Sequence, residues 1–467
     1  MARVLLVKPP TGDIYGVLKE ITPEYPPLGL AYIAAFLESR GHEIRIIDLS
    51  VELYTAQSLC KEVDKFSPSV VGITANTPTA DNAYSIIDNL RKTFPRLLYV
   101  LGGPHPTALP YEALQHADVV VRGEAEQSFL ELVTTHQKHG FNLKEFSRVN
   151  GISFKSGKKF INTCERLPEK DLDKYPLPAR HLLKMDKYHY FGARRHPLTN
   201  IVTSRGCPFR CSYCNKNISG YVYRKRSAAN ILAELNMLVA DYGISEIHIS
   251  DDTFSMDKNR VLDFCNLVRH ERLDLAFYPH NGLRVDSINR ELLAQMRSIG
   301  FYAMVFGVES GNQQILNNIG KGITLQQVRD AFKLAKRFNY ETWGFFILGL
   351  KGETRQTAMD TIRFARELDP DVAKFHILVP YPGTPDYERL KNRMLVKKWS
   401  DFSIFNRPTF RPENMTEIEL YDLFKLAFRS YYLRPKPIFR TVLRSCSSPR
   451  ALKESFKAGL SVCKTLV

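Results

Sequence analysis

Three cysteines crowd into eight residues near the middle of the chain, at Cys207, Cys211 and Cys214. Their thiolates can hold one side of an iron–sulfur cubane and leave one iron without a protein ligand. An iron that is open in this way can chelate the amino and carboxylate groups of a small molecule. Zinc is the alternative, but a closed zinc site takes four ligands, commonly as two paired motifs, and the chain has no second Cys-x-x-Cys pair. Because His248, His280 or a remote cysteine could complete a zinc site, the spacing favours the cluster without excluding zinc.

The composition surrounding these cysteines is that of an ordinary globular protein. A chain of 467 residues with 44% hydrophobic and 24% charged residues suits two or three domains. The other five cysteines are scattered, so we expect no disulfide framework. No apolar run approaches the length of a membrane span, and the N-terminus has the pattern of a β-strand rather than of a signal peptide. We therefore expect a cytoplasmic protein.

The positive charge of the chain is concentrated at its end. The formal net charge is +16, and residues 429–467 hold nine basic residues and one acidic residue, Glu454. Apolar residues recur at helical spacing within Arg450–Leu466, a pattern typical of helices that lie on anionic membranes. Packing against the rest of the protein is the alternative use of such a stripe. Peripheral membrane contact would suit a lipid substrate, and we expect no nucleic-acid partner.

Residues 1–138 alternate strand and helix five times, which predicts a doubly wound parallel sheet, Rossmann-like or flavodoxin-like. Ligands of such sheets lie beyond the carboxyl ends of the strands. The predicted strands are Val4–Val7, Ile44–Asp48, Val70–Ala75, Leu97–Leu101 and Val119–Arg122. The predicted helices are Leu28–Arg40, Thr55–Phe66, Asp81–Phe94, Tyr111–His116 and Gln127–Gln137.

Residues 139–195 are predicted as a linker that carries a β-hairpin, Gly151–Phe154 and Lys159–Asn162. Residues 196–390 resume the alternation with six strand–helix units, which fits a partial parallel barrel. Its predicted strands are Thr199–Ser204, Glu246–Ser250, Ala276–Pro279, Tyr302–Gly307, Thr342–Leu348 and Ala373–Leu378. Its predicted helices are Ala228–Asp241, Lys258–His270, Arg290–Ser298, Leu325–Phe338 and Thr354–Leu368. Residues 391–467 are predicted as a basic helical region with helices near Thr416–Tyr432 and Arg450–Leu466.

The cysteine motif resembles the C-x3-C-x-aromatic-C signature of the radical S-adenosylmethionine (SAM) superfamily, with Tyr213 at the aromatic position. In that family a reduced [4Fe-4S] cluster cleaves SAM to methionine and a 5′-deoxyadenosyl radical, which abstracts a hydrogen atom from the substrate. The resemblance implies that further SAM contacts gather at the carboxyl ends of the barrel strands. The implied contacts are Tyr213 and Gly349 for the adenine, Asp251 and Asp252 for the ammonium, Arg284 for the carboxylate, and Glu309 and Ser310 for the ribose. An aspartate pair at a strand end can instead cap a helix, and a glycine there can simply make a turn.

The first domain lacks the G-x-G-x-x-G dinucleotide fingerprint and the G-x4-G-K-[ST] phosphate loop. Its segments Tyr25–Leu30, Gly102–Thr107 and Arg122–Glu126 resemble the cobalamin-binding domain of B12-dependent radical SAM proteins. Together with the barrel, the resemblance spans residues 1–390 in the family's order. The cobalamin contacts that it implies are Pro27, Asn76, Thr77, Gly103, His105, Thr107, Gly123 and Glu124.

Two features depart from the relatives of this domain. Ala125 stands where the family often has glycine, which can alter that loop without removing the fold. The D-x-H-x-x-G motif of proteins that ligate cobalt through histidine is missing, so we expect no histidine on the lower face of the cobalt. His105 is expected to position the corrinoid or its nucleotide tail, and the alternative is a loop histidine bonded to backbone.

The resemblance implies methylation of an unactivated carbon or a phosphinate phosphorus, with one SAM methylating cobalamin and a second SAM supplying the radical. A radical cyclase like those of tetrapyrrole synthesis is the alternative within the family. A non-catalytic cobalamin or iron–sulfur sensor is the alternative from another class. The implied partners are a small-molecule or lipid substrate and an electron donor such as flavodoxin or ferredoxin.

Overall fold

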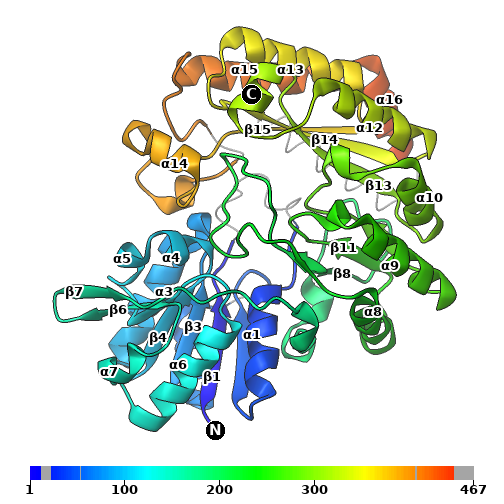
Figure 1. Ribbon diagram of the computed structural model, residues 1–467. Coiled ribbons are helices and arrows are strands. Elements are labelled where there is room, and N and C mark those ends of the chain that lie inside the picture. Colours follow the sequence, from blue (N-terminus) through cyan, green and yellow to red (C-terminus); the bar gives the residue numbers. More distant parts are fainter. Residues whose placement is uncertain (12–22, 53, 405–406, 446–467) are drawn as a thin grey trace.

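The computed structural model describes residues 1–11, 23–52, 54–404 and 407–445. Two α/β bodies face each other: the first is coloured blue to cyan in Figure 1 and the second green to orange. In the described part of the chain, no helix is long and apolar enough to cross a lipid bilayer.

The first body is built on a seven-stranded sheet with the order β2-β1-β3-β4-β5-β6-β7. Its five parallel strands are β1 (Arg3–Lys8), β2 (Glu43–Asp48), β3 (Val70–Thr74), β4 (Leu98–Gly102) and β5 (Val119–Val121). Its helices are α1 (Leu28–Glu38), α2 (Ala56–Phe66), α3 (Ala80–Thr93), α4 (Pro104–Ala108), α5 (Pro110–Ala113), α6 (Glu126–His139) and α7 (Leu143–Phe146). One apolar cluster lies between the sheet and α1 and α6, and another lies on the opposite face under α2 and α3. The doubly wound fold is confirmed.

The hairpin consists of β6 (Ile152–Ser156) and β7 (Lys159–Asn162) and continues this sheet instead of lying in a linker. Strand β6 pairs antiparallel with β5, and Phe154 is fully buried in the core of the first body. An uncovered β5 would present a row of unpaired backbone groups, which the hairpin covers. The sheet therefore extends past residue 138, whereas the boundaries expected at 195 and 390 stay predictions.

The second body is the partial barrel. Its six parallel strands are β8 (Leu198–Ile201), β11 (Glu246–Ile249), β12 (Ala276–Tyr278), β13 (Ala303–Glu309), β14 (Glu341–Leu348) and β15 (Val372–Ile377). They form two three-stranded sheets, which isolated bridges between Phe277 and Phe301 and between Leu283 and Phe306 connect. The surrounding helices are α8 (Ala228–Tyr242), α9 (Lys258–His270), α10 (Arg290–Ser298), α11 (Gln313–Asn318), α12 (Leu325–Arg337) and α13 (Arg355–Leu368).

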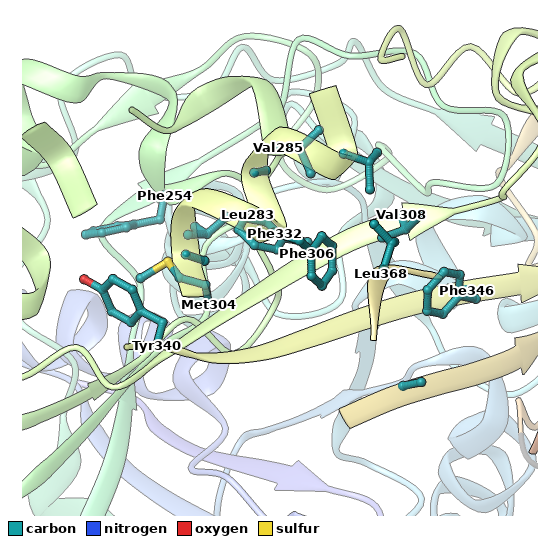
Figure 2. Packing of buried hydrophobic residues seen from close by; sticks show 14 of the residues in the cluster. Phe254, Leu283, Val285, Met304, Phe306, Val308, Phe332, Tyr340, Phe346 and Leu368 are labelled. Atoms are coloured by element: carbon teal, nitrogen blue, oxygen red, sulfur yellow. The ribbon is translucent and has the colours of Figure 1, made fainter. Parts of the chain in front are cut away.

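The main apolar core lies between these strands and their helices. Figure 2 shows Phe306 beside Phe332, and their ring centroids are 5.1 Å apart. Side chains that alternate with these along the strands point to the opposite face, into the barrel. The helices therefore fix the strands from outside and leave the inner face for other contacts.

The last helices of the described residues are α14 (Pro385–Leu390), α15 (Glu417–Tyr432) and α16 (Pro435–Ser445). The predicted helix at Thr416–Tyr432 is confirmed, and its residues Leu420, Leu423 and Phe424 belong to the barrel core. This helix is therefore an integral part of the barrel. The predicted helix Arg450–Leu466 lies outside the described residues, and membrane contact through it stays a prediction.

Candidate active site between the two domains

The cysteine loop is closed at its base by two short antiparallel strands, β9 (Ser204–Arg205) and β10 (Arg224–Lys225). Gly206 opens the loop with φ +82°, and a Cβ there would lie 2.2 Å from the carbonyl oxygen of Val222. Only glycine fits this position. The Cys207 amide donates to the carbonyl of Gly220 at 3.3 Å, which fixes the loop in a wrapped conformation.

The three thiols lie in positive surroundings. The pKa of the Cys211 thiol is lowered to about 6 because Cys214 donates a hydrogen bond to its thiolate and because Lys321 and Arg284 are close. Donation to Cys211 and burial raise the pKa of Cys214. A third cation, Lys216, faces the thiolates of Cys214 and Cys207, which raise its pKa although burial lowers it. Clustered cations of this kind stabilise an anionic thiolate-ligated iron–sulfur group.

Among the described residues, no three histidines, cysteines, aspartates or glutamates surround a point that could hold a single metal ion. A tetrahedral zinc site needs such convergence, whereas the thiolates of a cubane each bind a different iron. The donor set and its surroundings therefore fit the cluster better than zinc.

The two aspartates predicted to bind SAM have different surroundings. Asp251 is buried and accepts from the Thr203 amide at 2.6 Å and from the Ser204 hydroxyl at 2.7 Å. Asp252 is exposed, accepts from the Gly206 amide at 2.9 Å and borders a cavity. Asp251 is thus fully engaged within the protein, and Asp252 remains available to a ligand.

Arg284, the predicted contact for the SAM carboxylate, has partners within the protein. Its guanidinium forms a bidentate ion pair with Asp286, at 2.9 and 2.8 Å, and donates to the carbonyl oxygen of Lys321 at 2.9 Å. The guanidinium also lies 3.4 Å from the ring centroid of Phe209. Arg284 therefore fixes the cysteine loop against the barrel, and its direct contact with SAM stays a prediction.

Glu309, Lys321 and Tyr213 form a buried cluster next to the cysteines. The Lys321 ammonium lies 2.7 Å from the Glu309 carboxylate and 3.3 Å from the Tyr213 hydroxyl. Glu309 has φ +65°, a left-handed conformation that is unfavourable for a residue with a side chain. Glu309 and Tyr213, both predicted SAM contacts, thus interact with the same ammonium of Lys321. This shared partner holds the two side chains in place next to the cysteines.

Ser310 and Gly349 lie beneath the strand ends. The Ser310 hydroxyl is fully buried and bonds Thr361 at 3.1 Å. A Cβ at Gly349 would lie 2.9 Å from Leu420 of α15, so that helix covers this glycine. Neither residue is in the lining of the cavity between the two domains, and the ribose and adenine contacts expected at these two positions stay predictions.

A cavity of about 450 Å³ lies between the carboxyl edge of the first sheet and the cysteine loop. Apolar residues of β1, β3, β4, α1 and α6 line its inner part. There Leu6 and Phe129 lie so close to Gly72 that a side chain at this position would not fit between them. Its outer part meets the barrel, and the barrel residues that line it are Val202, Ser204, Arg205, Asn215, Lys216, Ile218, Ser219, Gly220, Ser250 and Asp252. A ligand in this cavity contacts both domains.

Three of the eight predicted cobalamin contacts line this cavity, namely Gly103, Gly123 and Glu124. Gly103 has φ +99°, and a Cβ there would lie 2.8 Å from the carbonyl oxygen of Ala75, so the turn requires glycine. Glu124 also bonds Arg224 at 2.5 Å and Arg205 at 3.3 Å, which ties the two domains together. The glycine-rich edge lets a planar cofactor such as a corrinoid approach the backbone closely.

The other five predicted contacts, Pro27, Asn76, Thr77, His105 and Thr107, lie outside the cavity lining. Thr107 supports the lining indirectly, because its hydroxyl accepts from the Gly123 amide at 3.2 Å. His105 is fully buried, and its Nδ1 lies 3.2 Å from the Thr77 hydroxyl while its Nε2 lies 3.1 Å from the Tyr84 hydroxyl. His105 thus holds the loop through side-chain partners, and its contact with a corrinoid stays a prediction.

Two comparisons identify the family. Residues 15–133 match the B12 binding domain and residues 201–365 match the Radical SAM superfamily. An uncharacterised methyltransferase of Pyrococcus horikoshii is 36% identical over 446 residues, and the alignment covers 94% of each chain. This chain belongs to the cobalamin-binding radical SAM family. It is an enzyme whose cofactors are a [4Fe-4S] cluster, SAM and cobalamin, and the sensor alternative is discarded.

More distant relatives agree with this family. An anaerobic magnesium-protoporphyrin IX monomethyl ester cyclase of Cereibacter sphaeroides is 28% identical, over 94% of this chain and 73% of the cyclase. The solved structure of OxsB, a cobalamin-dependent SAM radical enzyme with aqua-cobalamin and SAM bound, has a TM-score of 0.76 at 16% identity. That match covers 98% of this chain and 70% of OxsB, and it shows that the two proteins share a fold.

Sequence reasoning missed the lysines that surround the cysteines. Lys321 stands between Gly320 and Gly322, and Lys216 follows the last cysteine by two residues. For Lys216, the signal in the sequence was its position next to the cysteine motif. For Lys321 the only local sign was a charged residue between two glycines.

Proposed function

We propose that this enzyme methylates an unactivated carbon, or a phosphinate phosphorus, of a small-molecule substrate. The observation that carries the proposal is the cavity shared by the glycine-rich edge of the first sheet and the cysteine loop. A corrinoid in that cavity would lie next to the cluster loop, as transfer of a methyl group to a substrate radical requires. The methyltransferase relative, which matches nearly the whole length of the chain, supports the same reaction.

The cofactors would supply the chemistry, since SAM cleaved at the cluster yields the radical and cobalamin carries the methyl group. Cys207, Cys211 and Cys214 would hold the cluster, and Asp252 would accept a hydrogen bond from the SAM ammonium. Gly102, Gly103 and Gly123 would let the corrinoid approach the backbone. The ion pairs of Glu124 with Arg205 and Arg224 close the domain junction and limit the access of water.

Anaerobically reconstituted protein, reduced in the presence of SAM that carries a labelled methyl group, tests the proposal. We expect 5′-deoxyadenosine and, with substrate present, a product that is heavier by one CH2 unit and carries the label. A variant with alanine at all three cluster cysteines should form neither. If reduced wild-type protein produces no 5′-deoxyadenosine, the proposed function is wrong.

Ring formation is the second candidate, because the Cereibacter sphaeroides cyclase matches 94% of this chain. The mass of the product separates the two reactions, since a cyclase adds no CH2 unit. Either reaction needs a one-electron donor for the cluster, and we propose a flavodoxin or a ferredoxin for this role.

A further inference from the structure

The barrel has an inner face that packing does not fill. Along β14 and β15 buried and half-buried residues alternate strictly. The buried set, which includes Phe346 and Phe375, packs against the helices outside the barrel. The half-buried set points inward, and its members are Glu341, Trp343, Phe345, Ile347, Val372, Lys374 and His376. A closed barrel fills its interior with side chains. Here Trp343 and Phe345 contact an inner apolar cluster that includes Tyr278 and Val305, yet the inward set stays partly exposed, so the interior is incompletely packed.

Polar side chains occupy the β11 and β12 side of the barrel interior. The Tyr25 hydroxyl bonds His248 Nδ1 at 2.5 Å, and His248 Nε2 bonds the Glu246 carboxylate at 2.7 Å. Tyr302 donates to the same carboxylate at 2.8 Å. Glu246 lies at the amino end of β11, whereas the Tyr25 hydroxyl also lies 3.3 Å from His280 Nδ1, past the carboxyl end of β12. Together with Tyr190, which packs against Tyr25 and His248, these side chains form a polar layer along the β11 and β12 side of the barrel interior.

Lys374 is the only lysine or arginine on β14 and β15, and it lies midway along the inner face. Its ammonium is 4.9 Å from the ring centroid of Trp343 and 5.5 Å from that of Phe345. Glu341, the acidic residue of the inward set, is engaged by Trp343 Nε1 at 2.7 Å and by Arg194 at 3.4 Å. No ion pair between Lys374 and a carboxylate exists among the described residues.

Lys374 carries the positive charge of this face, because the histidines near it are neutral. Burial lowers the pKa of Lys374 to about 8, so the amine remains largely protonated at neutral pH. Burial, with the charge of Lys374 as a further cause, lowers the pKa of His376 to about 3. Burial and the neighbouring His248 also lower the pKa of His280 to about 3. Both histidines are therefore neutral, and the ammonium between two aromatic rings has no carboxylate partner within residues 1–11, 23–52, 54–404 and 407–445.

We propose that Lys374 binds an anionic oxygen group of the substrate, a carboxylate or a phosphate, while Trp343 and Phe345 contact an apolar ring next to that group. This inference names the substrate class for the proposed function and rests on it. The polar layer and the aromatic walls would hold the rest of the molecule toward the cysteine loop. Binding through a poorly solvated ammonium gains from the low local dielectric.

Equilibrium dialysis of the reconstituted full-length protein, with SAM present so that its own site is filled, tests the inference. The probes are naphthalene-2-carboxylate, 2-naphthyl phosphate and the neutral naphthalene-2-carboxamide. We expect at least one anion to bind about tenfold more tightly than the carboxamide. The tighter of the two anions identifies the group that the site prefers.

Three variants assign that preference to the lysine. Lys374→Met should reduce the affinity for the anions to that for the carboxamide, and Lys374→Arg should keep the preference. Lys333→Met removes an exposed lysine of α12 and should bind like wild type. Equal binding of anion and carboxamide by the wild type, or a preference that survives Lys374→Met, overturns the inference. The same wild-type sample is also tested for formation of 5′-deoxyadenosine. That result bears on the proposed function alone, so the two proposals can fail independently.

Discussion

Adjacent carboxylates at the end of β11 show how position decides the role of a residue. Asp251 is enclosed by the Thr203 amide and hydroxyl, by Ser204 and by Arg260, whose guanidinium is 4.0 Å away. Burial raises the pKa of Asp251, although its hydrogen bonds and Arg260 oppose the shift. Asp252 faces solvent and the cavity instead. The first carboxylate anchors the strand that leads into the cysteine loop, and the second can serve a ligand.

The two corresponding amide substitutions should therefore behave differently. Asp251→Asn leaves buried hydroxyl donors poorly paired and should lower the free energy of unfolding by about 2 kcal/mol. Asp252→Asn should change it by less than about 0.5 kcal/mol and weaken SAM binding about tenfold. Urea denaturation and SAM titration measure the two effects. Equal stability losses in both variants would contradict these assignments.

The cysteine motif could be predicted from the sequence because its ligands are close together along the chain. The pairings of the other candidates could not, since they depend on contacts formed by folding. Arg284 reaches Asp286 only because the 3-10 turn Val285–Ser287 brings the two side chains together. Gly349 is covered by Leu420, which is some seventy residues away in the sequence. Burial by a distant helix leaves no local signal.

At the scale of elements, α15 protects the exposed edge of the barrel. Strand β15 pairs only with β14 among the described strands, so its other edge needs partners. The Tyr432 hydroxyl accepts from the Ala373 amide at 3.1 Å and donates to the Ala373 carbonyl at 2.7 Å. One phenol thus satisfies both backbone groups of a buried residue.

Tyr432→Phe removes both of these bonds and should lower the free energy of unfolding by about 1–2 kcal/mol. Tyr421→Phe, on the same helix, removes a hydroxyl for which no such backbone bonds are described, and it should be nearly neutral. Thermal or urea unfolding compares the pair. A loss of the same size in both variants would show that the edge contacts contribute little.

The turn between β14 and α13 carries a buried acid, Glu353. Burial raises its pKa to about 8, although the amides of Gly349 and Leu350 donate to it. Its Oε1 has no hydrogen-bond partner among the described residues. The folded protein thus keeps a proton that the unfolded chain releases near its ordinary pKa of 4.5.

Folding stability contributed by this group is therefore lost as the pH rises from about 5 to about 8. Glu353→Gln cannot ionise, so its stability relative to wild type should increase over that interval. Urea unfolding at pH 5.5, 7 and 8.5 measures the difference. A difference that stays constant with pH would mean that Glu353 is already ionised in the folded state.

Most strands and helices could be predicted to within about two residues because apolar periodicity is local. The hairpin was also predicted, but its place was not, since pairing with β5 depends on which sheet edge is uncovered. Lys374 and His376 were missed for a related reason. Alternation in Val372–Ile377 is typical of a strand with one solvated face, and only the closure of the barrel turns that face inward.

At the scale of the whole molecule, contacts between the first domain and the segment that follows the barrel hold the two domains together. Trp399 Nε1 donates to Glu112 at 2.6 Å, and the Ser400 amide donates to Asp81 at 3.0 Å. The His105 ring packs against Trp399, so the loop below the cavity also contacts the C-terminal segment. With the ion pairs of Glu124, these contacts connect the two domains.

Filling the cavity should separate cobalamin binding from cluster binding. Gly102 lines the cavity, and a Cβ there would have no neighbour closer than 3.7 Å, so Gly102→Leu places a side chain in open space. We expect cobalamin affinity to fall more than about tenfold while the fold and the cluster persist. Cobalamin titration followed by absorbance checks this, and unchanged affinity would place the corrinoid elsewhere.

The central claim is that one chain holds an iron–sulfur cubane on three cysteines and a corrinoid across the domain junction. Quantification of iron, sulfide and cobalt in protein reconstituted without oxygen tests it most directly. We predict about four irons, four sulfides and one cobalt per chain, with iron and sulfide lost and cobalt kept when Cys207, Cys211 and Cys214 are all replaced by alanine. Iron that remains in the triple variant, or wild-type protein that binds no cobalt, would contradict the account.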